Sequence, residues 1–286
     1  MSIFDRKFGK NFLKLVPTNP GVYQILDINS QLIYIGKAKN LRRRLGQYRN
    51  ARRIKKHRKM QKIIRDATQI QFEVCSSNLE AELLETRLIQ INRPKWNIAG
   101  AFYFLYPLIG MKQCQGMLSF VYTTHPELFE DYLFFGAFRS RGISGEAFFN
   151  LMKLLKYVGH IIPRSKSKPQ LRVKHSYVYS FRQIPPEWMD IWSAFWKGQS
   201  KDALEILVLA LIENAGARKT PSTIQEQLNS LKRFWRHEAL PLAQALNLSG
   251  HSSYPLSQLD RDPVFLRFRH LNKSVRSGQF NCDNLV

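Results

Sequence analysis

Apolar residues near the start of the chain occur in short alternating runs that predict strands. The run Pro20–Leu26 begins with a Pro-Gly pair, and turn-forming residues 27–30 separate it from the run Leu32–Ile35. Two such runs on either side of a short turn are typical of a β-hairpin. Residues 70–74 alternate between apolar and polar in the same way, which predicts a third strand.

Three further segments have the spacing of amphipathic helices. In the first, Asn40 can cap a helix whose apolar stripe consists of Leu41, Leu45 and Tyr48. Arg44 lies beside this stripe. A basic helix over 55–67 and a helix over 78–92, ended by Pro94, are also expected. The order ββααβα predicts a compact α+β module of about 100 residues, in which helices flank a small antiparallel sheet.

Beyond residue 100 the pattern becomes mixed and then mainly helical. Short strands with turns are expected over 101–138, a polar basic linker over 163–174, and helices over 145–158, 186–197, 202–212 and 221–235. The last forty-odd residues are basic and rich in turn-forming residues. We therefore expect four regions, namely the module at 1–100, a mixed region at 101–185, a helical hairpin at 186–240 and a basic tail at 241–286.

Composition excludes several classes of protein. Hydrophobic residues make up 44% and charged residues 23%, which is typical of a globular chain rather than a disordered or fibrous one. The longest apolar runs are about ten residues, well below the roughly 18 to 20 that a membrane-spanning helix needs. The first residues lack a secretory signal, and three widely spaced cysteines encode no disulfide framework or zinc knuckle. We expect a cytoplasmic protein with no membrane partner.

The net charge of +23 points to a polyanionic partner. Residues 1–100 hold 21 Lys or Arg against 7 Asp or Glu, a net charge of +14, and no acidic residue occurs between Lys37 and Lys62. An ordinary solvated basic face remains the alternative, although such a face usually interleaves charges of both signs. The candidate DNA-binding residues are Lys39, Arg42, Arg43, Arg52, Arg53, Lys55 and Lys56.

One constellation of residues links these elements: Gly21-Val22-Tyr23, then Tyr34-Ile35-Gly36, Lys37, Arg44, Glu85 and Asn97. It resembles the signature of GIY-YIG nucleases, in the form found in the N-terminal domain of the excinuclease subunit UvrC. The resemblance covers Pro17–Asn97. Taken singly, the tyrosines fit core aromatics and Glu85 fits a solvated helix carboxylate, so the signal lies in the order of all the elements together.

The resemblance implies a metal-dependent DNA endonuclease that makes a single-strand incision by phosphodiester hydrolysis, in nucleotide excision repair and the SOS response. It implies these catalytic residues: Tyr23, Tyr34, Lys37, Arg44, Tyr48, Glu85 and Asn97. Glu85 would hold Mg²⁺ or Mn²⁺, because hard cations favour oxygen ligands, and Arg44 would stabilise the phosphate.

A motif tyrosine is implied as the base that takes a proton from water. Such a tyrosine needs a pKa below the free value of about 10, and Lys37 is the expected cause of that lowering because it follows Tyr34 closely. Which of Tyr23 and Tyr34 acts as the base stays open. Asn97 is expected to make structural hydrogen bonds that tie the end of the module to the site.

The UvrC resemblance continues beyond the module. Residues 132–138 are similar to a UvrC segment, but no cysteine occurs in 163–187, so we expect no iron–sulfur cluster there. Residues 194–234 resemble a degenerate form of the hairpin through which UvrC meets the helicase UvrB, although 219–223 depart from the hairpin's core pattern. Either a UvrB-like helicase binds here or the segment is an ordinary packed helical pair.

Nothing resembles the second nuclease domain or the helix-hairpin-helix domain of full-length UvrC, so one incision centre is expected, as in short UvrC homologues of the Cho type. Two other hypotheses stay open. The chain could be a non-catalytic DNA-binding repair adaptor. It could also be a structure-specific or mobile-element GIY-YIG nuclease outside excision repair.

Overall fold

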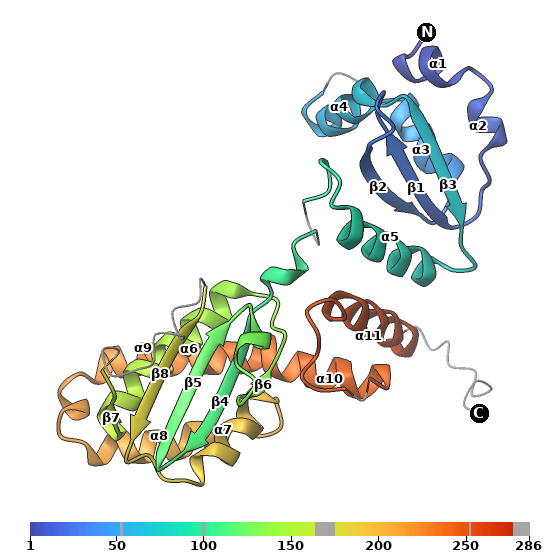
Figure 1. Cartoon of the computed structure of the whole chain (residues 1–286). Coiled ribbons are helices and arrows are strands. Elements are labelled where there is room, and N and C mark those ends of the chain that lie inside the picture. The colour runs from blue at the N-terminus through green and yellow to red at the C-terminus, as the bar shows by residue number, and fades with distance from the viewer. Residues whose placement is uncertain (52–53, 99–100, 164–174, 252, 277–286) are drawn as a thin grey trace. The chain divides into compact units, whose positions relative to one another are not determined.

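The computed structural model describes residues 1–51, 54–98, 101–163, 175–251 and 253–276, which are divided between two compact units (Figure 1). The first unit is built on Met1–Tyr103 and the second on Phe104–Leu271. The elements of the first unit are α1 (Ile3–Phe8), α2 (Phe12–Leu15), β1 (Gly21–Leu26), β2 (Leu32–Ala38), α3 (Leu41–Arg49), a 3₁₀ turn (Lys55–His57), α4 (Arg58–Asp66), β3 (Gln69–Val74) and α5 (Asn78–Asn92).

The first unit contains a three-stranded antiparallel sheet in the order β2-β1-β3. The register pairs Tyr23 of β1 with Gly36 of β2 and with Phe72 of β3. The predicted α+β module, with its hairpin, third strand and three helices, is confirmed. Strand β2 extends three residues beyond the predicted Ile35, so both Gly36 and Lys37 belong to the strand.

Helices cover both faces of this sheet (Figure 1). Tyr23 and Ile25 pack with residues of α3 and α4, whereas Val22 and Ile35 pack with residues of α5. The two sets follow from the alternation of side chains along a strand, since residues one position apart point to opposite faces. The motif tyrosines therefore belong to the α3 and α4 side of the sheet.

The short helices α1 and α2 were not predicted. Ser2 caps α1 by accepting a hydrogen bond from the amide of Asp5 at 3.0 Å. Phe4 is buried, and its ring lies 4.9 Å from that of Phe8 and 5.7 Å from that of Phe12. Helices of four and six residues span at most about two turns, which is too short for a hydrophobic period to show.

The second unit is a five-stranded sheet, in the order β6-β4-β5-β8-β7, that packs on helices (Figure 1). Its elements are β4 (Leu108–Cys114), β5 (Met117–Thr123), β6 (Leu133–Phe135), α6 (Arg141–Val158), β7 (His160–Ile161), β8 (Tyr177–Arg182), α7 (Trp188–Trp196), α8 (Asp202–Glu213), α9 (Pro221–Phe234), α10 (Leu240–Ser249) and the part of α11 (Arg261–Arg276) up to Leu271, with short 3₁₀ turns between some of them. No helix in the described ranges is long and apolar enough to cross a membrane.

The regions expected at 101–185 and 186–240 share one hydrophobic core. Phe120 and Phe148 come from the first region, and Trp196, Leu231 and Phe234 from the second, yet all five are buried in the same cluster. The buried aromatic and leucine side chains of the supposed UvrB-binding hairpin thus face the interior of their own unit, whereas Leu209 and Ile212 of the same segment are exposed. This arrangement favours the interpretation of the segment as an ordinary packed helical pair.

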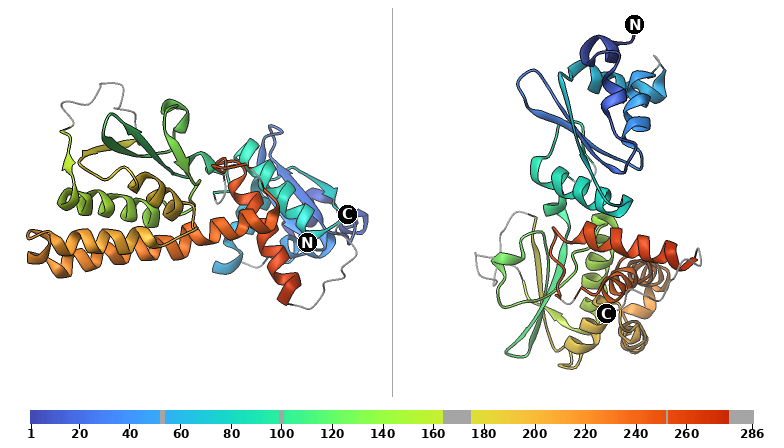
Figure 2. Two further views of the ribbon diagram at one scale, coloured as in Figure 1. Left: turned by 90° about the horizontal axis from the view of Figure 1, so that it is seen from below. Right: turned by 90° about the vertical axis from the view of Figure 1, so that its right-hand side faces the viewer.

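The expectation of a turn-rich end after residue 240 is wrong for the described part, because α10 and α11 occupy much of it. A π-helical turn at Trp235–Ala239 joins α9 to α10, and Figure 2 shows the two as one long rod. Pro241 lies two residues after the end of this turn. Proline lacks the amide proton that a regular helix would use, and the wider turn accommodates the missing hydrogen bond. Residues 164–174 of the linker expected at 163–174, and residues 277–286 of the tail, lie outside the described residues.

Candidate active site

The two motif glycines are required by close approaches in the sheet. A Cβ atom on Gly36 would lie 2.4 Å from the hydroxyl oxygen of Tyr23, and one on Gly21 would lie 2.2 Å from the carbonyl oxygen of Glu73. Neither distance is possible between non-bonded atoms. Glycine at these positions lets the Tyr23 side chain cross β2 and lets β1 and β3 approach one another.

Tyr23, Arg44 and Tyr48 form a hydrogen-bonded cluster between the sheet and α3. The Tyr23 and Tyr48 hydroxyls lie 3.1 Å apart, and Nε of Arg44 donates to the Tyr23 hydroxyl at 3.1 Å. Arg44 Nη1 also donates to Gln47 at 2.7 Å. Helix α3 fixes these positions, and Asn40 caps it by accepting a hydrogen bond from the Arg43 amide at 2.8 Å. The predicted location of Arg44 beside the apolar stripe is confirmed.

Burial raises the pKa of the Tyr23 phenol above its ordinary value, and the neighbouring Tyr34 raises it further. Burial likewise raises the pKa of Tyr48, with Tyr23 as the next cause. Both phenols are therefore neutral at physiological pH. The expectation of a motif tyrosine with a lowered pKa is wrong for Tyr23.

Lys37 does not lie beside the Tyr34 phenol, as the sequence had suggested. The two residues are three positions apart on β2, so their side chains point to opposite faces of the sheet. The Lys37 ammonium instead forms an ion pair with Glu82 of α5. The side chain of Asn78 donates to the same Glu82 oxygen at 3.2 Å.

Glu85 lies on the inner side of α5, one helical turn after Glu82. Its Oε1 accepts a hydrogen bond from the backbone amide of Lys37 at 3.1 Å. Burial raises the pKa of this carboxyl above its ordinary value; the Lys37 charge and amide and the Arg44 charge oppose this shift, whereas Glu82 adds to it. The negative charge of this buried carboxylate is therefore only partly compensated by its neighbours, and its oxygens have lone pairs that no hydrogen bond within the described residues uses. Both properties fit a ligand of a hard divalent cation.

Glu85 is the only predicted metal ligand, and the surrounding residues offer few others. Within the described ranges, no group of three or more His, Cys, Asp or Glu side chains is arranged to hold a metal ion. A cation held by Glu85 would therefore take most of its ligands from water and from a bound phosphate.

Asn97 completes the exposed edge of β2. Its Oδ1 accepts from the amide of Ile35 and its Nδ2 donates to the carbonyl of Ile35, both at 2.9 Å, while the Trp96 amide donates to the carbonyl of Ile33 at 3.0 Å. Together with the bond from Lys37 to Glu85, these contacts satisfy the outward-facing groups of an edge strand. Asn97 therefore makes the structural hydrogen bonds that the sequence suggested.

A cavity of about 270 Å³ opens where β2 ends and α3 begins; it is lined by Lys37, Ala38, Lys39, Asn40, Arg43, Arg44, Gln47, Asn78 and Glu82. Two of the expected DNA-binding residues, Lys39 and Arg43, and two of the expected catalytic ones, Lys37 and Arg44, share this cavity. Tyr34 lies near its deeper neighbour Tyr23, with the two ring centres 6.1 Å apart.

The other expected DNA-binding residues lie elsewhere. Lys55 is exposed. The guanidinium of Arg42 donates hydrogen bonds to the backbone carbonyls of Val16 at 2.7 Å and Lys14 at 3.3 Å, so this side chain holds the preceding segment in place. Arg52 and Arg53, and the side chain of Lys56, lie outside the described residues.

Sequence reasoning missed Gln47 and Glu82. Both could have been found from spacing, because Gln47 follows Arg44 by three residues and Glu82 precedes Glu85 by three, so each pair shares one face of its helix. The signal is weak, because a polar residue at this spacing is common on any exposed helix face.

Comparison with known families and proteins identifies the first unit. The model of the UvrC-like GIY-YIG domain matches residues 19–98. UvrABC system protein C of Streptococcus pneumoniae (strain JJA) is 41% identical over 100 residues, which are 35% of this chain and 16% of the relative. UvrABC system protein C of Streptococcus thermophilus (strain CNRZ 1066) is 31% identical over 199 residues, which are 69% of this chain and 31% of the relative.

The chain thus spans less than a third of the length of these relatives. Among solved structures, the GIY-YIG N-terminal endonuclease domain of UvrC from Thermotoga maritima, bound to magnesium, is 37% identical. That similarity covers 32% of this chain and 97% of the other, with a TM-score of 0.29.

Proposed function

Because residues 19–98 form a UvrC-like GIY-YIG endonuclease domain, we propose that this chain is a divalent-metal-dependent DNA endonuclease. It makes a single-strand incision by phosphodiester hydrolysis in nucleotide excision repair. The observation that carries the proposal is the hydrogen-bonded cluster of Tyr23, Arg44 and Tyr48. The Tyr23 hydroxyl of this cluster lies against Gly36 of β2, and the next residue of that strand, Lys37, donates its amide to Glu85. The net charge of +14 in residues 1–100 provides the attraction for a polyanion.

Arg44 stabilises the negative charge that develops on the phosphate. Its bonds to Tyr23 and Gln47 fix the plane of the guanidinium before substrate arrives, so little reorganisation is needed. The guanidinium keeps its charge at all physiological pH values. Arg44 also lines the cavity of about 270 Å³ where β2 ends and α3 begins, which leaves its remaining N–H groups for a phosphate there.

Glu85 is the protein ligand of the cation. A bound Mg²⁺ or Mn²⁺ supplies charge stabilisation for the leaving oxygen and for the phosphate. The bond from the Lys37 amide to Oε1 orients the carboxylate. Lys37 in turn is held by Glu82, so it adds positive charge near Glu85 from a fixed position.

Of the two motif tyrosines, Tyr34 is the better candidate to take a proton from the attacking water. The Tyr23 hydroxyl is buried, has a raised pKa and is already bonded to Arg44 and Tyr48. Tyr34 is half-buried, and no described residue forms a hydrogen bond with its hydroxyl. That hydroxyl is free to bond to a water molecule next to the phosphate.

A non-catalytic DNA-binding adaptor is the second candidate, since the positive charge alone would serve it. Complete retention of Tyr23, Tyr34, Arg44 and Glu85 favours the enzyme, because an adaptor needs no metal ligand. The similarity of the S. thermophilus relative over 199 residues extends past the nuclease domain, which favours a role in excision repair over a mobile-element nuclease.

Incision of a lesion-bearing duplex tests the proposal. With magnesium we expect one nick at a fixed distance from the lesion, and none with a chelator. A parallel reaction with added UvrB determines whether that helicase is needed. Binding without any nick under all these conditions would support the adaptor, and a cut set by sequence instead of the lesion would support a nuclease outside repair.

A further inference from the structure

A cluster of lysines and aromatic rings lies beside Tyr34, outside the residues expected to bind DNA. Nζ of Lys59 lies 5.3 Å from the centre of the Tyr34 ring. Nζ of Lys62 lies 5.9 Å, and that of Lys95 5.5 Å, from the centre of the Trp96 ring. All three lysines are exposed. We refer to these five residues as the lysine–aromatic surface.

The rings restrict where the lysine charges can lie. Lys59 and Lys62 are three residues apart on α4 and therefore share one face of the helix. Tyr34 belongs to β2, and Trp96 is anchored to the edge of that strand by the bond from its amide to the carbonyl of Ile33 at 3.0 Å. Attraction between each ammonium and a fixed ring limits the freedom of a flexible side chain.

The positive charge of this surface is available to an external anion. Lys59, Lys62 and Lys95 form no ion pair with an acidic side chain in the part of the chain that the structure describes. This distinguishes them from Lys37, which is paired with Glu82. The surface also adjoins the catalytic cluster through Tyr34, whose ring centre lies 6.1 Å from that of Tyr23.

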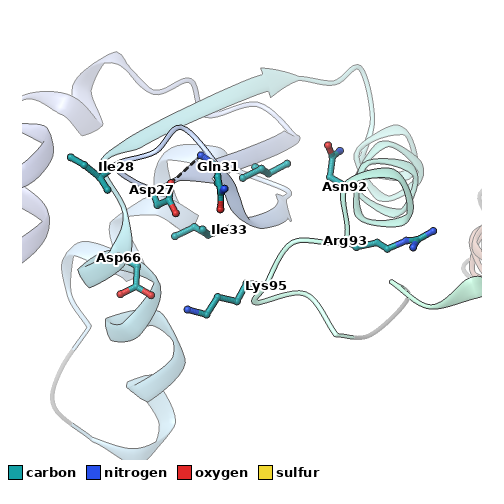
Figure 3. Close-up of a pocket in the computed structure, with 9 residues that line it drawn as sticks. Asp27, Ile28, Gln31, Ile33, Asp66, Asn92, Arg93 and Lys95 are labelled. Atoms are coloured by element: carbon teal, nitrogen blue, oxygen red, sulfur yellow. Dashed lines mark hydrogen bonds between the residues drawn. The ribbon is translucent and has the colours of Figure 1, made fainter.

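Acidic residues mark where the surface ends. Lys95 also lines a hollow of about 760 Å³ that contains Asp27 and Asp66. Figure 3 shows the Lys95 side chain extending toward Asp66. Because carboxylates repel phosphates, Asp27 and Asp66 make this hollow less favourable for a DNA strand than the path over Lys59 and Lys62, although Arg93 also lines it.

We propose that Lys59 and Lys62 contact neighbouring backbone phosphates of the DNA strand that passes through the catalytic cluster, with Lys95 at the outer end of this path. The inference rests on the proposed nuclease function. The lysines lie over the rings of Tyr34 and Trp96, so the surface binds phosphate without reading bases. Binding there holds the strand in position on one side of the scissile phosphate.

Two arginines on the adjacent stripe of α4, one helical turn before and after Lys62, provide a charge-matched control. Arg58 and Arg65 line a separate hollow of about 480 Å³, together with Ile3, Ile54, Lys55 and Gln61. Replacing either pair with alanine removes two positive charges from α4 and from the chain. Only direct contact with phosphates distinguishes the two pairs.

The test compares Lys59→Ala/Lys62→Ala with Arg58→Ala/Arg65→Ala, each in a Glu85→Gln chain, by the affinity for a fluorescein-labelled duplex across a range of salt concentrations. We expect the lysine pair to weaken binding roughly tenfold at about 0.1 M salt and to reduce the slope of log K against log salt by about 1.8. The arginine pair should weaken binding less than roughly threefold. An equal loss of DNA affinity in the two double variants, or no loss in either, would overturn the proposal.

A second measurement separates this inference from the proposed function. In the chain with Glu85 intact, the lysine pair should nick more slowly than the native chain at limiting DNA, and this loss should shrink as the DNA concentration rises, because weaker binding is its main cause. A native chain that does not nick would refute the nuclease, while the comparison of affinities would still decide the lysine–aromatic surface. Normal nicking with equal affinities in both pairs would refute the surface alone.

Discussion

At the residue scale, the site depends on a small number of close contacts around β2. Gly36 makes room for the hydroxyl of Tyr23, and that hydroxyl accepts a hydrogen bond from Arg44. Glu85 and Asn97 bind the outward-facing groups of the same strand. The motif residues therefore share one strand and its neighbours, although they are spread over more than sixty positions of the sequence.

Replacing Gly36 with Ala should damage both stability and activity. The new Cβ would meet the Tyr23 hydroxyl at 2.4 Å, so Tyr23 must move away from Arg44. We expect a loss of about 1–3 kcal/mol in the free energy of unfolding, measured by urea denaturation, and a large loss of nicking. Gly46→Ala in α3 is the control, since its Cβ would meet only Leu13 at 3.9 Å and should leave stability unchanged or slightly higher.

Glu85→Gln should stabilise the chain in metal-free buffer at pH 8. The folded-state pKa of Glu85 lies above its ordinary value, so the folded state holds this proton more tightly than the unfolded state does. Ionisation of Glu85 therefore costs stability as the pH rises above that ordinary value, and glutamine avoids the cost. Thermal unfolding at several pH values measures this difference.

The gain in stability from Glu85→Gln should vanish as the pH falls below the ordinary pKa of glutamate. At such a pH, Glu85 is protonated in both the folded and the unfolded native chain, so it is as neutral as the glutamine. Magnesium should stabilise the native chain more than the variant, because the cation binds the folded carboxylate. A variant that is less stable than the native chain at every pH would contradict the assignment of Glu85 as an undercompensated buried carboxylate.

At the element scale, the edge of β2 is closed by side chains instead of another strand. Asn97→Ala removes both hydrogen bonds to Ile35 and should cost about 1–3 kcal/mol in the free energy of unfolding. Nicking should fall as well, because the same edge orients Glu85 through the Lys37 amide. Asn92→Ala, which removes one exposed bond to the carbonyl of Leu88, should change stability by no more than about 0.5 kcal/mol.

The elements of the first unit were largely predictable, and their contacts were not. Periodicity located the hairpin, α3 and α5, because apolar residues must face a core at regular spacing. It did not reveal that Lys37 and Tyr34 point to opposite faces, since the second strand was predicted to end at Ile35, before Lys37. The raised pKa of Tyr23 was also missed, because burial depends on packing that spacing does not encode.

At the scale of the whole molecule, the second unit has a core of its own that includes the supposed partner-binding helices. Phe234 is fully buried, with its ring centre 4.9 Å from that of Phe138 and 5.2 Å from that of Trp196. The resemblance to UvrC had left open whether this segment binds a UvrB-like helicase or is an ordinary packed helical pair. Aromatic residues at helical spacing predict a buried face, but not whether it belongs to this chain or to a partner.

Phe234→Ala should therefore destabilise the second unit by about 3–5 kcal/mol, as expected for a large cavity in a well-packed core. Calorimetry can measure this as a lower melting temperature. Leu209→Ala on α8, whose side chain is 64% exposed, is the control and should have little effect. A Phe234→Ala chain with native stability that fails to bind UvrB would instead indicate a docking surface.

The most direct test of the hydrolytic site is single-turnover nicking by the native and Glu85→Gln chains, with DNA affinity measured in parallel at one salt concentration. We predict that the variant nicks at least about a hundredfold more slowly in saturating magnesium and binds DNA with native affinity. Nicking at the native rate by Glu85→Gln would contradict the assignment of the catalytic site.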